Sequence, residues 1–333
     1  MFSKRELLAR TLDVIGFGHL LRKAPSWNGV LIFNYHRIGE PGDSPFDHNL
    51  WSASAEDFDQ QLCFLKKNFD VIGLRDLDRL LDQPRGRFVM VTFDDGYRDN
   101  YSVAFPILKS RGVSATFFIS TGFIDRPRVP WWDELAWMTR TTSVELLPAN
   151  EWLPTVIVLG QQDRVKAFGR FLAVYKSLDV RLTDPYLNFL ADALGTGRCP
   201  ASLANDLWMT WDMLREMKAS GMTFGGHTVT HPILANQTAD QQDWEVSECQ
   251  RRLVEELGGT IDAFSYPNGK PESFDEFTRA ALRAYGFRWS FAHDGGYCQP
   301  ERCDRLALRR SPVETDVGLS QFRATATLPQ VFS

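Results

Sequence analysis

Residues 89–97 read VMVTFDDGY, an apolar run that leads directly into two adjacent carboxylates and a glycine. Such a run is typical of a buried strand, and the Asp-Asp-Gly after it ends the strand in a turn. In a parallel barrel, side chains at the carboxyl ends of strands project into the mouth, where reactions are carried out. Asp94 and Asp95 are therefore candidate functional residues, although an Asp-Gly turn is also common without any function.

A second polar segment, FGGHTVTHP at 224–232, holds two of the six histidines in the chain. His227 and His231 are four residues apart, so both rings can face one point from a helical turn or a tight loop. Zinc peptidases with HExxH use the same spacing, but Thr228 stands where their general-base Glu would be. Two histidines and one aspartate make the ligand set of a catalytic zinc site, and a spare carboxylate can then take a proton from water. A capped or solvated histidine pair is the alternative.

Around these segments, short apolar runs alternate with helix-period segments, which predicts a parallel sheet or barrel. We expect strands at 30–35, 88–93, 115–120, 222–225, 263–266 and 288–292. We expect helices at 56–68, 74–81, 100–110, 211–219, 242–257 and 273–284. Residues 124–207 break this rhythm, with RPRVPWWDELAW followed by two expected helices at 164–177 and 184–194. We interpret them as an insertion on the barrel rim, within a barrel domain of residues 29–333.

The composition is that of a folded soluble protein, with 44% hydrophobic and 24% charged residues. The net charge of -5 comes from 37 Lys+Arg against 42 Asp+Glu without clustering, which disfavours nucleic acid as a partner. The five cysteines have no CxxC spacing and are interpreted as free thiols in a reducing compartment.

The N-terminal segment, residues 1–28, is expected to be helical and has no uninterrupted apolar core or small-residue cleavage site of a signal peptide. No window is apolar for long enough to span a membrane. We therefore expect a cytoplasmic protein. Leucines and an isoleucine between residues 7 and 20 could form one amphipathic face that contacts a membrane or a partner.

With these two polar segments, the chain resembles the polysaccharide deacetylases, carbohydrate esterase family 4 with the NodB homology domain. TFDDG at 92–96 and HTVTH at 227–231 are similar to the first two motifs of that family. Further segments are similar to family segments and follow the family order: LIFNYHRI at 31–38, FDQQLCFLKKNFDVI at 58–72, PILKSRGVSATFFIST at 106–121, MTWDMLREMKASGMTFGGHTVTHP at 209–232 and FSYPNGK at 264–270. The resemblance implies an irregular (β/α)7 barrel, to which the helical rim insertion is added.

The resemblance also implies a reaction, the removal of an N-acetyl group (in some members an O-acetyl group) from amino sugars. It implies that Asp94 is the general base. The implied metal ligands are Asp95, His227 and His231, and the metal is most often zinc, with Co2+, Ni2+ or Mn2+ as alternatives. The implied oxyanion site lies around a third motif, here Tyr266, Pro267 and Asn268.

Two departures from the family pattern concern the catalytic groups. Ser265 stands where the third motif has an Arg that pairs with the base, and the C-terminal Leu-x-x-His motif of the general acid is missing. One branch, which includes enzymes acting on poly-N-acetylglucosamine, supplies the acid from an N-terminal Tyr-His, and Tyr35-His36 is similar to it. His36 is then the implied acid, and a buried structural histidine is the alternative. Arg309-Arg310 resembles an Arg-containing strand near the end of this branch, and a plain salt-bridged strand end is equally compatible.

The expected partner is therefore an acetylated amino-sugar glycan or glycolipid. Trp131 and Trp132 could form a platform on which a pyranose ring stacks, or could be the insertion's own core. Two other functions stay open: hydrolysis of a non-sugar amide on the same barrel, and sugar binding without catalysis.

Overall fold

The computed structural model describes residues 27–82 and 86–333. The predicted N-terminal helical segment, and with it the expected membrane contact, lies almost entirely outside the described residues. Among the helices of the described chain, none combines the length and the apolar character needed to span a membrane.

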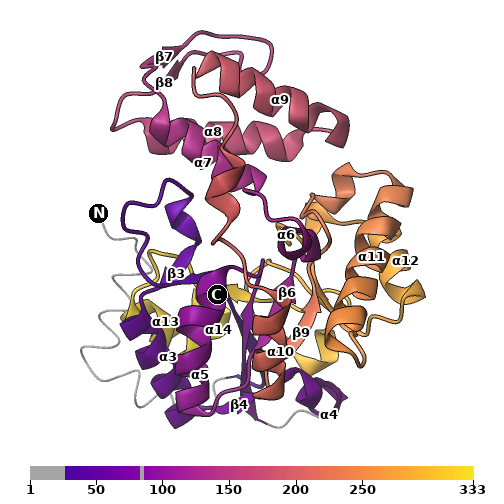
Figure 1. Cartoon of the computed structure of the whole chain (residues 1–333). Coiled ribbons are helices and arrows are strands. Elements are labelled where there is room, and N and C mark those ends of the chain that lie inside the picture. The colour runs from indigo at the N-terminus through magenta and orange to yellow at the C-terminus, as the bar shows by residue number, and fades with distance from the viewer. Residues whose placement is uncertain (1–26, 83–85) are drawn as a thin grey trace.

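The centre of the fold is a curved sheet of parallel strands in the order β11-β10-β9-β6-β5-β1-β12, with β4 as an additional neighbour of β5 (Figure 1). The strands are β1 Gly29–Tyr35, β4 Asp70–Ile72, β5 Arg87–Phe93, β6 Thr116–Ile119, β9 Thr223–Gly226, β10 Ala263–Ser265, β11 Trp289–Phe291 and β12 Ser311–Pro312. A parallel bridge between Phe291 and Leu308, three residues before β12, joins the two edges of the sheet. The described sheet is therefore curled into the expected (β/α) barrel, with all six predicted strands present.

Helices surround this sheet (Figure 1). They are α3 Ala55–Asn68, α4 Leu77–Asp82, α5 Phe105–Arg111, α6 Thr121–Asp125, α10 Trp211–Ala219, α11 Ala239–Leu257, α12 Glu276–Ala284, α13 Leu319–Thr327 and α14 Pro329–Phe332. Their boundaries follow local chemistry: Ser54 caps α3, and Thr238 with Gln241 forms a capping box at the start of α11. Short helical turns occupy His48–Leu50, Leu74–Asp76, Asn100–Ala104, Ala201–Ala204, Leu234–Asn236, Pro271–Ser273 and Pro300–Arg302.

The barrel interior changes from apolar to polar along the strands. One buried cluster contains inward-facing residues that precede the carboxyl ends of the strands, among them Val30, Ile32, Met90, Phe118, Trp289 and Phe291. Since side chains alternate between the two faces of a strand, the next inward positions are Asn34 on β1, Thr92 on β5 and Ser265 on β10. The interior is narrow: a Cβ on Gly225 would lie 2.6 Å from both Ala263 O and the Phe118 ring. The apolar layer therefore forms a solid floor under the polar residues at the carboxyl ends.

Above the carboxyl ends stands a separate group of helices, α7 Trp131–Thr141, α8 Arg164–Ser177 and α9 Val180–Ala193, with the hairpin of β7 Leu146–Leu147 and β8 Ile157–Val158 (Figure 1). These elements have their own apolar core, which includes Leu135, Phe171, Tyr186 and Leu190. They all fall within the predicted insertion at 124–207, whose limits stay a prediction. The small strands β2 Arg37–Ile38 and β3 Trp51–Ala53 form a pair beside the barrel mouth.

Candidate active site and metal centre

The predicted site residues come together at the carboxyl ends of the parallel strands. Asp94 and Asp95 follow β5, His227 follows β9 and His36 follows β1. His231 reaches the same place through the loop after β9. All of them line one cleft of about 710 Å³. These side chains meet because neighbouring parallel strands end at the same edge of the sheet.

Asp95, His227 and His231 form a cluster whose possible ligand atoms lie within 4.8 Å of one another. Asp95 Oδ1 is 3.4 Å from His227 Nε2 and 3.3 Å from His231 Nε2. The Nδ1 atom of His227 is 2.7 Å from the Ser265 carbonyl oxygen, to which it donates when it carries the proton. This arrangement leaves the Nε2 lone pair of His227 directed at the carboxylate, as in histidines that bind a metal.

The cluster fits a divalent cation. Asp95 Oδ1 is buried and has no hydrogen-bond partner of good geometry among the described residues. An oxygen anion facing two imidazole nitrogens matches the ligands that zinc prefers, and three protein ligands leave a position open. Burial acts to raise the pKa of Asp95, but its close contacts with His227 and His231 and the charges of His231 and His36 outweigh burial and hold the pKa well below its ordinary value. The carboxylate is thus ready to bind a cation.

The second aspartate, Asp94, is paired with a cation that lies far away in the sequence. Arg310, fully buried just before β12, donates from Nη1 to Asp94 Oδ1 and from Nη2 to Oδ2, both at 2.8 Å. Arg310 Nη2 also donates to Ser265 Oγ at 2.8 Å, and Nη1 donates to Asn34 Oδ1 at 2.6 Å. Arg310 therefore makes the pairing with Asp94 that the resemblance implies for an Arg at the position of Ser265. The ion pair that Arg310 forms at this strand end is therefore buried, and its partner is Asp94, the residue that the resemblance implies as the general base.

This pairing decides the protonation of Asp94. Burial alone would raise the pKa of Asp94, but the charges of Arg310 and His227 and the Arg310 hydrogen bonds lower it far below the ordinary value. Asp94 is thus an ionised, buried carboxylate beside the possible metal ligands. A carboxylate in that position can accept a proton from a neighbouring water.

Two further histidines, His36 and His293, line the same cleft, with ring centroids 6.2 Å apart. Burial, followed by the charges of Arg310 and His36, lowers the pKa of His293 to about 3. His293 is therefore neutral at physiological pH and is a poor proton donor. His36 is half-buried, and its backbone is held by Ser52 Oγ and by Asn100 Nδ2.

Among Tyr266, Pro267 and Asn268 of the third motif, one residue has a backbone N–H that is free to donate. The Tyr266 N–H donates to Phe291 O at 3.1 Å, and Pro267 has no N–H. The Tyr266 ring is buried against Phe274, and its hydroxyl donates to Leu306 O. The Asn268 N–H has no acceptor in the part of the chain that the structure describes. Asn268 lines the cleft with a φ of 62°, a strained conformation of the kind that gathers at functional sites.

The two tryptophans of the insertion differ in their surroundings. Trp132 is buried, with its ring 4.3 Å from the His231 ring and its Nε1 donating to Tyr97 Oη. Trp131 is more open, although one face stacks on Tyr175 at 4.2 Å. Trp132 thus supports a possible metal ligand, a role that its sequence position did not indicate. Stacking of either residue on a sugar stays a prediction.

The residue after Trp132, the fully buried Asp133, connects the insertion to the barrel. Its carboxylate accepts hydrogen bonds from Tyr97 Oη at 2.8 Å and from the Asp47 N–H at 3.0 Å. Burial raises the pKa of Asp133 to about 7, and its hydrogen bonds and Arg37 only partly oppose this. Asp133 therefore anchors both Tyr97, two residues after Asp95, and the loop that borders the cleft.

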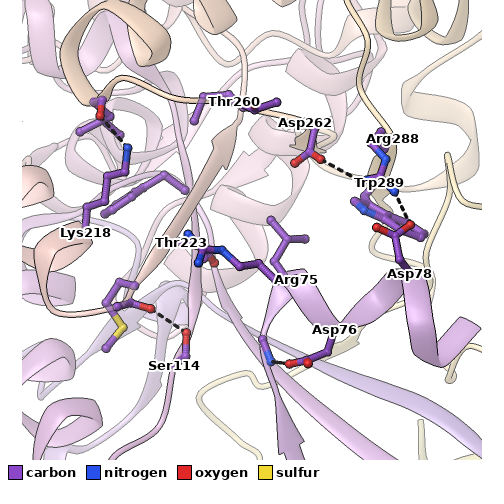
Figure 2. A pocket seen from close by; sticks show the side chains of 17 residues that line it. Arg75, Asp76, Asp78, Ser114, Lys218, Thr223, Thr260, Asp262, Arg288 and Trp289 are labelled. Carbon is purple, nitrogen blue, oxygen red and sulfur yellow. Dashed lines mark hydrogen bonds and ion pairs between the residues drawn. The ribbon is translucent and has the colours of Figure 1, made fainter.

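A second cleft, of about 650 Å³, lies at the opposite end of the strands (Figure 2). Charged side chains of this cleft are paired within the protein. Arg288 pairs with Asp78 and Asp262, and Lys218 donates to the carbonyls of Leu257 and Gly258. Among the described residues, the only cluster suited to a metal ion is the one at the carboxyl ends. The candidate metal centre therefore lies in the first cleft.

Comparisons with known proteins give a relative in sequence and solved structures with a similar fold. A putative polysaccharide deacetylase, YxkH of Bacillus subtilis (strain 168), is 35% identical over 92 residues, which cover 26% of this chain and only 30% of that relative. The Streptococcus pyogenes deacetylase PplD, solved in complex with acetate, has a similar fold, with a TM-score of 0.59, 19% identity, and coverage of 92% of this chain and 99% of that one. IcaB from Ammonifex degensii gives a TM-score of 0.58 at 20% identity, and the match covers 92% of this chain and 98% of that one.

The match that decides the family covers more than half of the chain. Residues 82–290, from the strand before Asp94 to the strand after the third motif, match the family described as polysaccharide deacetylase. This span contains both aspartates and both histidines of the candidate site. Taken with the barrel and the geometry of its mouth, it shows that the chain belongs to the polysaccharide deacetylase family.

Proposed function

We propose that this protein is a metal-dependent deacetylase that hydrolyses the N-acetyl group of an amino sugar in a polysaccharide, an oligosaccharide or a glycolipid precursor. One observation carries the proposal: an ionised, buried Asp94 lies beside an Asp-His-His cluster suited to a divalent cation, inside one cleft. A protein that only bound sugar would have no use for a base held in this way by a buried arginine.

Asp95, His227 and His231 would hold the ion, and zinc is the first candidate. When bound, such an ion supplies Lewis-acid polarisation of a carbonyl and favours the ionisation of water. Asp94 accepts the proton of the attacking water. Arg310 keeps Asp94 ionised before that transfer and holds both of its oxygens in a fixed orientation.

Departure of the sugar amine requires a proton on nitrogen, because an amide anion is too basic to leave at neutral pH. Histidine is the side chain that most readily donates a proton near neutral pH. His36 takes this role, since His293 is held neutral by its buried position beside Arg310. The Asn268 N–H is the backbone donor suited to the developing oxyanion, because the other two residues of the third motif have no N–H to offer.

The proposal is tested by acetate release from N-acetylglucosamine oligomers, with and without a chelator, and from O-acetylated sugars of matched size. We expect release from the N-acetyl oligomers that stops with chelator and returns on addition of Zn2+. Asp94→Asn should lose most of this activity, since a general base contributes roughly 10²–10⁴-fold. The matched control Asp192→Asn, on the exposed surface of α9, should keep it.

Two results would contradict the proposal. Metal binding without acetate release from any acetylated sugar would indicate a catalytically silent sugar-binding protein. Hydrolysis confined to non-sugar amides would indicate a different substrate class on the same barrel.

A further inference from the structure

The loop that carries the two histidines, residues 227–231, has an unusual backbone. Thr228 has a φ of 66° and His231 a φ of 57°, in the left-handed region that residues with a Cβ rarely adopt. These conformations set the direction of both imidazoles, because His231 is itself one of the two residues and Thr228 directly follows His227. Surrounding contacts must hold the loop in this form, since it is unfavourable on its own.

The carbonyl groups of the loop are held by the first residues of α6, the helix that follows β6. The Thr121 N–H donates to Thr228 O at 3.1 Å, and the Gly122 N–H donates to Val229 O at 2.9 Å. Gly122 permits this approach, since a Cβ there would lie 2.5 Å from Val229 O. These bonds leave the N–H groups in the middle of the loop to be satisfied from elsewhere.

A single carboxylate satisfies them. Glu245, on α11, accepts the Val229 N–H at 2.7 Å and the Thr230 N–H at 2.9 Å, both on Oε2. Its other oxygen, Oε1, accepts the Thr230 hydroxyl. Glu245 is only 4% exposed and forms no salt bridge within the described residues. Every hydrogen bond of this carboxylate therefore goes to the histidine loop.

Burying a carboxylate without a paired cation is a poor way to stabilise a fold, because the cost of desolvation is large. Burial accordingly raises the pKa of Glu245, against the effect of its hydrogen bonds. The benefit must then lie in what the carboxylate orders. We propose that Glu245 is a positioning residue: it fixes the left-handed loop so that His227 and His231 converge on Asp95 at the spacing that a metal ion requires. This inference rests on the proposed metal site.

The hydrogen-bond pattern makes a specific prediction about conservative variants. In Glu245→Gln, the amide oxygen can accept both N–H groups, as Oε2 does now, while the amide NH2 donates to the Thr230 hydroxyl. In Glu245→Asp the charge is kept, but the shorter side chain cannot reach both N–H groups from α11. If Glu245 acts by positioning the loop, Glu245→Gln should keep the metal affinity and Glu245→Asp should lose it. If only the negative charge near the site matters, Glu245→Asp should keep the affinity and Glu245→Gln should lose it.

The experiment measures the binding of Zn2+ and Co2+ to the chelator-stripped full chain by titration calorimetry, together with the visible spectrum of bound Co2+. We expect Glu245→Asp to bind 10–100-fold more weakly than the wild type, as is usual when a group that orients a ligand is lost. The Co2+ spectrum of this variant should also change. Glu245→Gln should bind within threefold of the wild type. Glu248→Gln is the matched control, on the same helix but paired with Arg251 away from the loop, and should bind normally.

Circular dichroism and thermal unfolding of the metal-free proteins separate misfolding from misplaced ligands. Glu245→Asp should keep the wild-type spectrum and unfold within a few degrees of it, so that its loss of affinity reports on the loop. Equal affinity of Glu245→Asp and the wild type, or stronger binding by Asp than by Gln, would overturn the inference and leave the metal site intact. Failure of the wild type itself to bind either ion would overturn both the metal site and this inference.

Discussion

The buried pair of Arg310 and Asp94 gives the sharpest quantitative test of the site. Their side chains are 1% and 3% exposed, and two hydrogen bonds of 2.8 Å join them. Arg310→Met keeps much of the volume but leaves the carboxylate with only Asn34 Nδ2 at 3.3 Å and Ser265 Oγ at 3.2 Å. Removing one partner of a buried ion pair costs about 3–5 kcal/mol, because the other charge stays buried and unpaired. We expect this loss in the free energy of unfolding at pH 7.

The pH dependence has a defined sign. In the wild type the pKa of Asp94 is lowered, so the contribution of the pair is complete above about pH 4 and is lost only as the pH falls further. In Arg310→Met, burial raises the pKa of Asp94 against only the charges of His227 and His36 and two longer hydrogen bonds, so protonation relieves the variant as the pH falls from 7 toward 5. The difference in unfolding free energy between the two proteins should therefore shrink at lower pH.

The assay is urea unfolding of the metal-free proteins at pH 5 and pH 7, with a check that the dependence on urea is unchanged. Arg309→Met is the matched control, because the neighbouring arginine is exposed and lies 3.4 Å from Asp294, a surface contact worth at most about 1 kcal/mol. Arg310→Met/Asp94→Asn should recover most of the stability lost in Arg310→Met, since no charge is left unpaired. Two results would refute the reasoning. One is an equal loss of unfolding free energy in Arg309→Met and Arg310→Met. The other is a difference between Arg310→Met and the wild type that is larger at pH 5 than at pH 7.

Three further outcomes are expected. Asp95→Asn should lose metal and activity together, whereas Asp94→Asn should keep the metal, so identical behaviour in metal analysis and acetate assays would reject these roles. His36→Ala should keep the metal but lose amide hydrolysis by roughly 10² or more, with much less loss on an activated ester that needs no protonated leaving group; equal losses on both substrates would exclude His36 as the acid. The raised pKa of Asp133, about 7, makes the wild type less stable as the pH rises from 5 to 7. Relative to the wild type, Asp133→Asn should gain about 2 kcal/mol in the free energy of unfolding as the pH rises from 5 to 7, measured by urea unfolding. A difference that does not change with pH would contradict the burial of a titrating carboxylate.

Much of the barrel and the centre of its site could be predicted because their signals are local. An apolar run such as 88–93 that ends in Asp-Asp-Gly specifies a strand and its last residue by the properties of neighbouring side chains alone. The spacing of His227 and His231 lies within one loop, so the convergence of their rings could also be inferred. Placing both segments at one edge required only the rule that parallel strands end together.

Other features depend on contacts that no local pattern contains. β12 has only two residues, Ser311 and Pro312, too few for a recognisable strand, yet its pairing with Phe33 and Asn34 brings Arg310 beside Asp94, 216 residues away. A buried carboxylate demands a partner, but the sequence does not say which cation reaches it.

The same reason explains the rest of what the sequence left undecided. The sequence alone was enough to predict the acidic pair, the histidine pair and the strands, because hydrophobic periodicity and turn chemistry depend on only a few neighbouring residues. Only the tertiary structure decided that Trp132 packs on His231, that the Tyr266 N–H is already used by Phe291, and that Glu245 holds the histidine loop. Each of these depends on how the closed barrel brings distant elements into contact, and burial then determines which polar groups must pair.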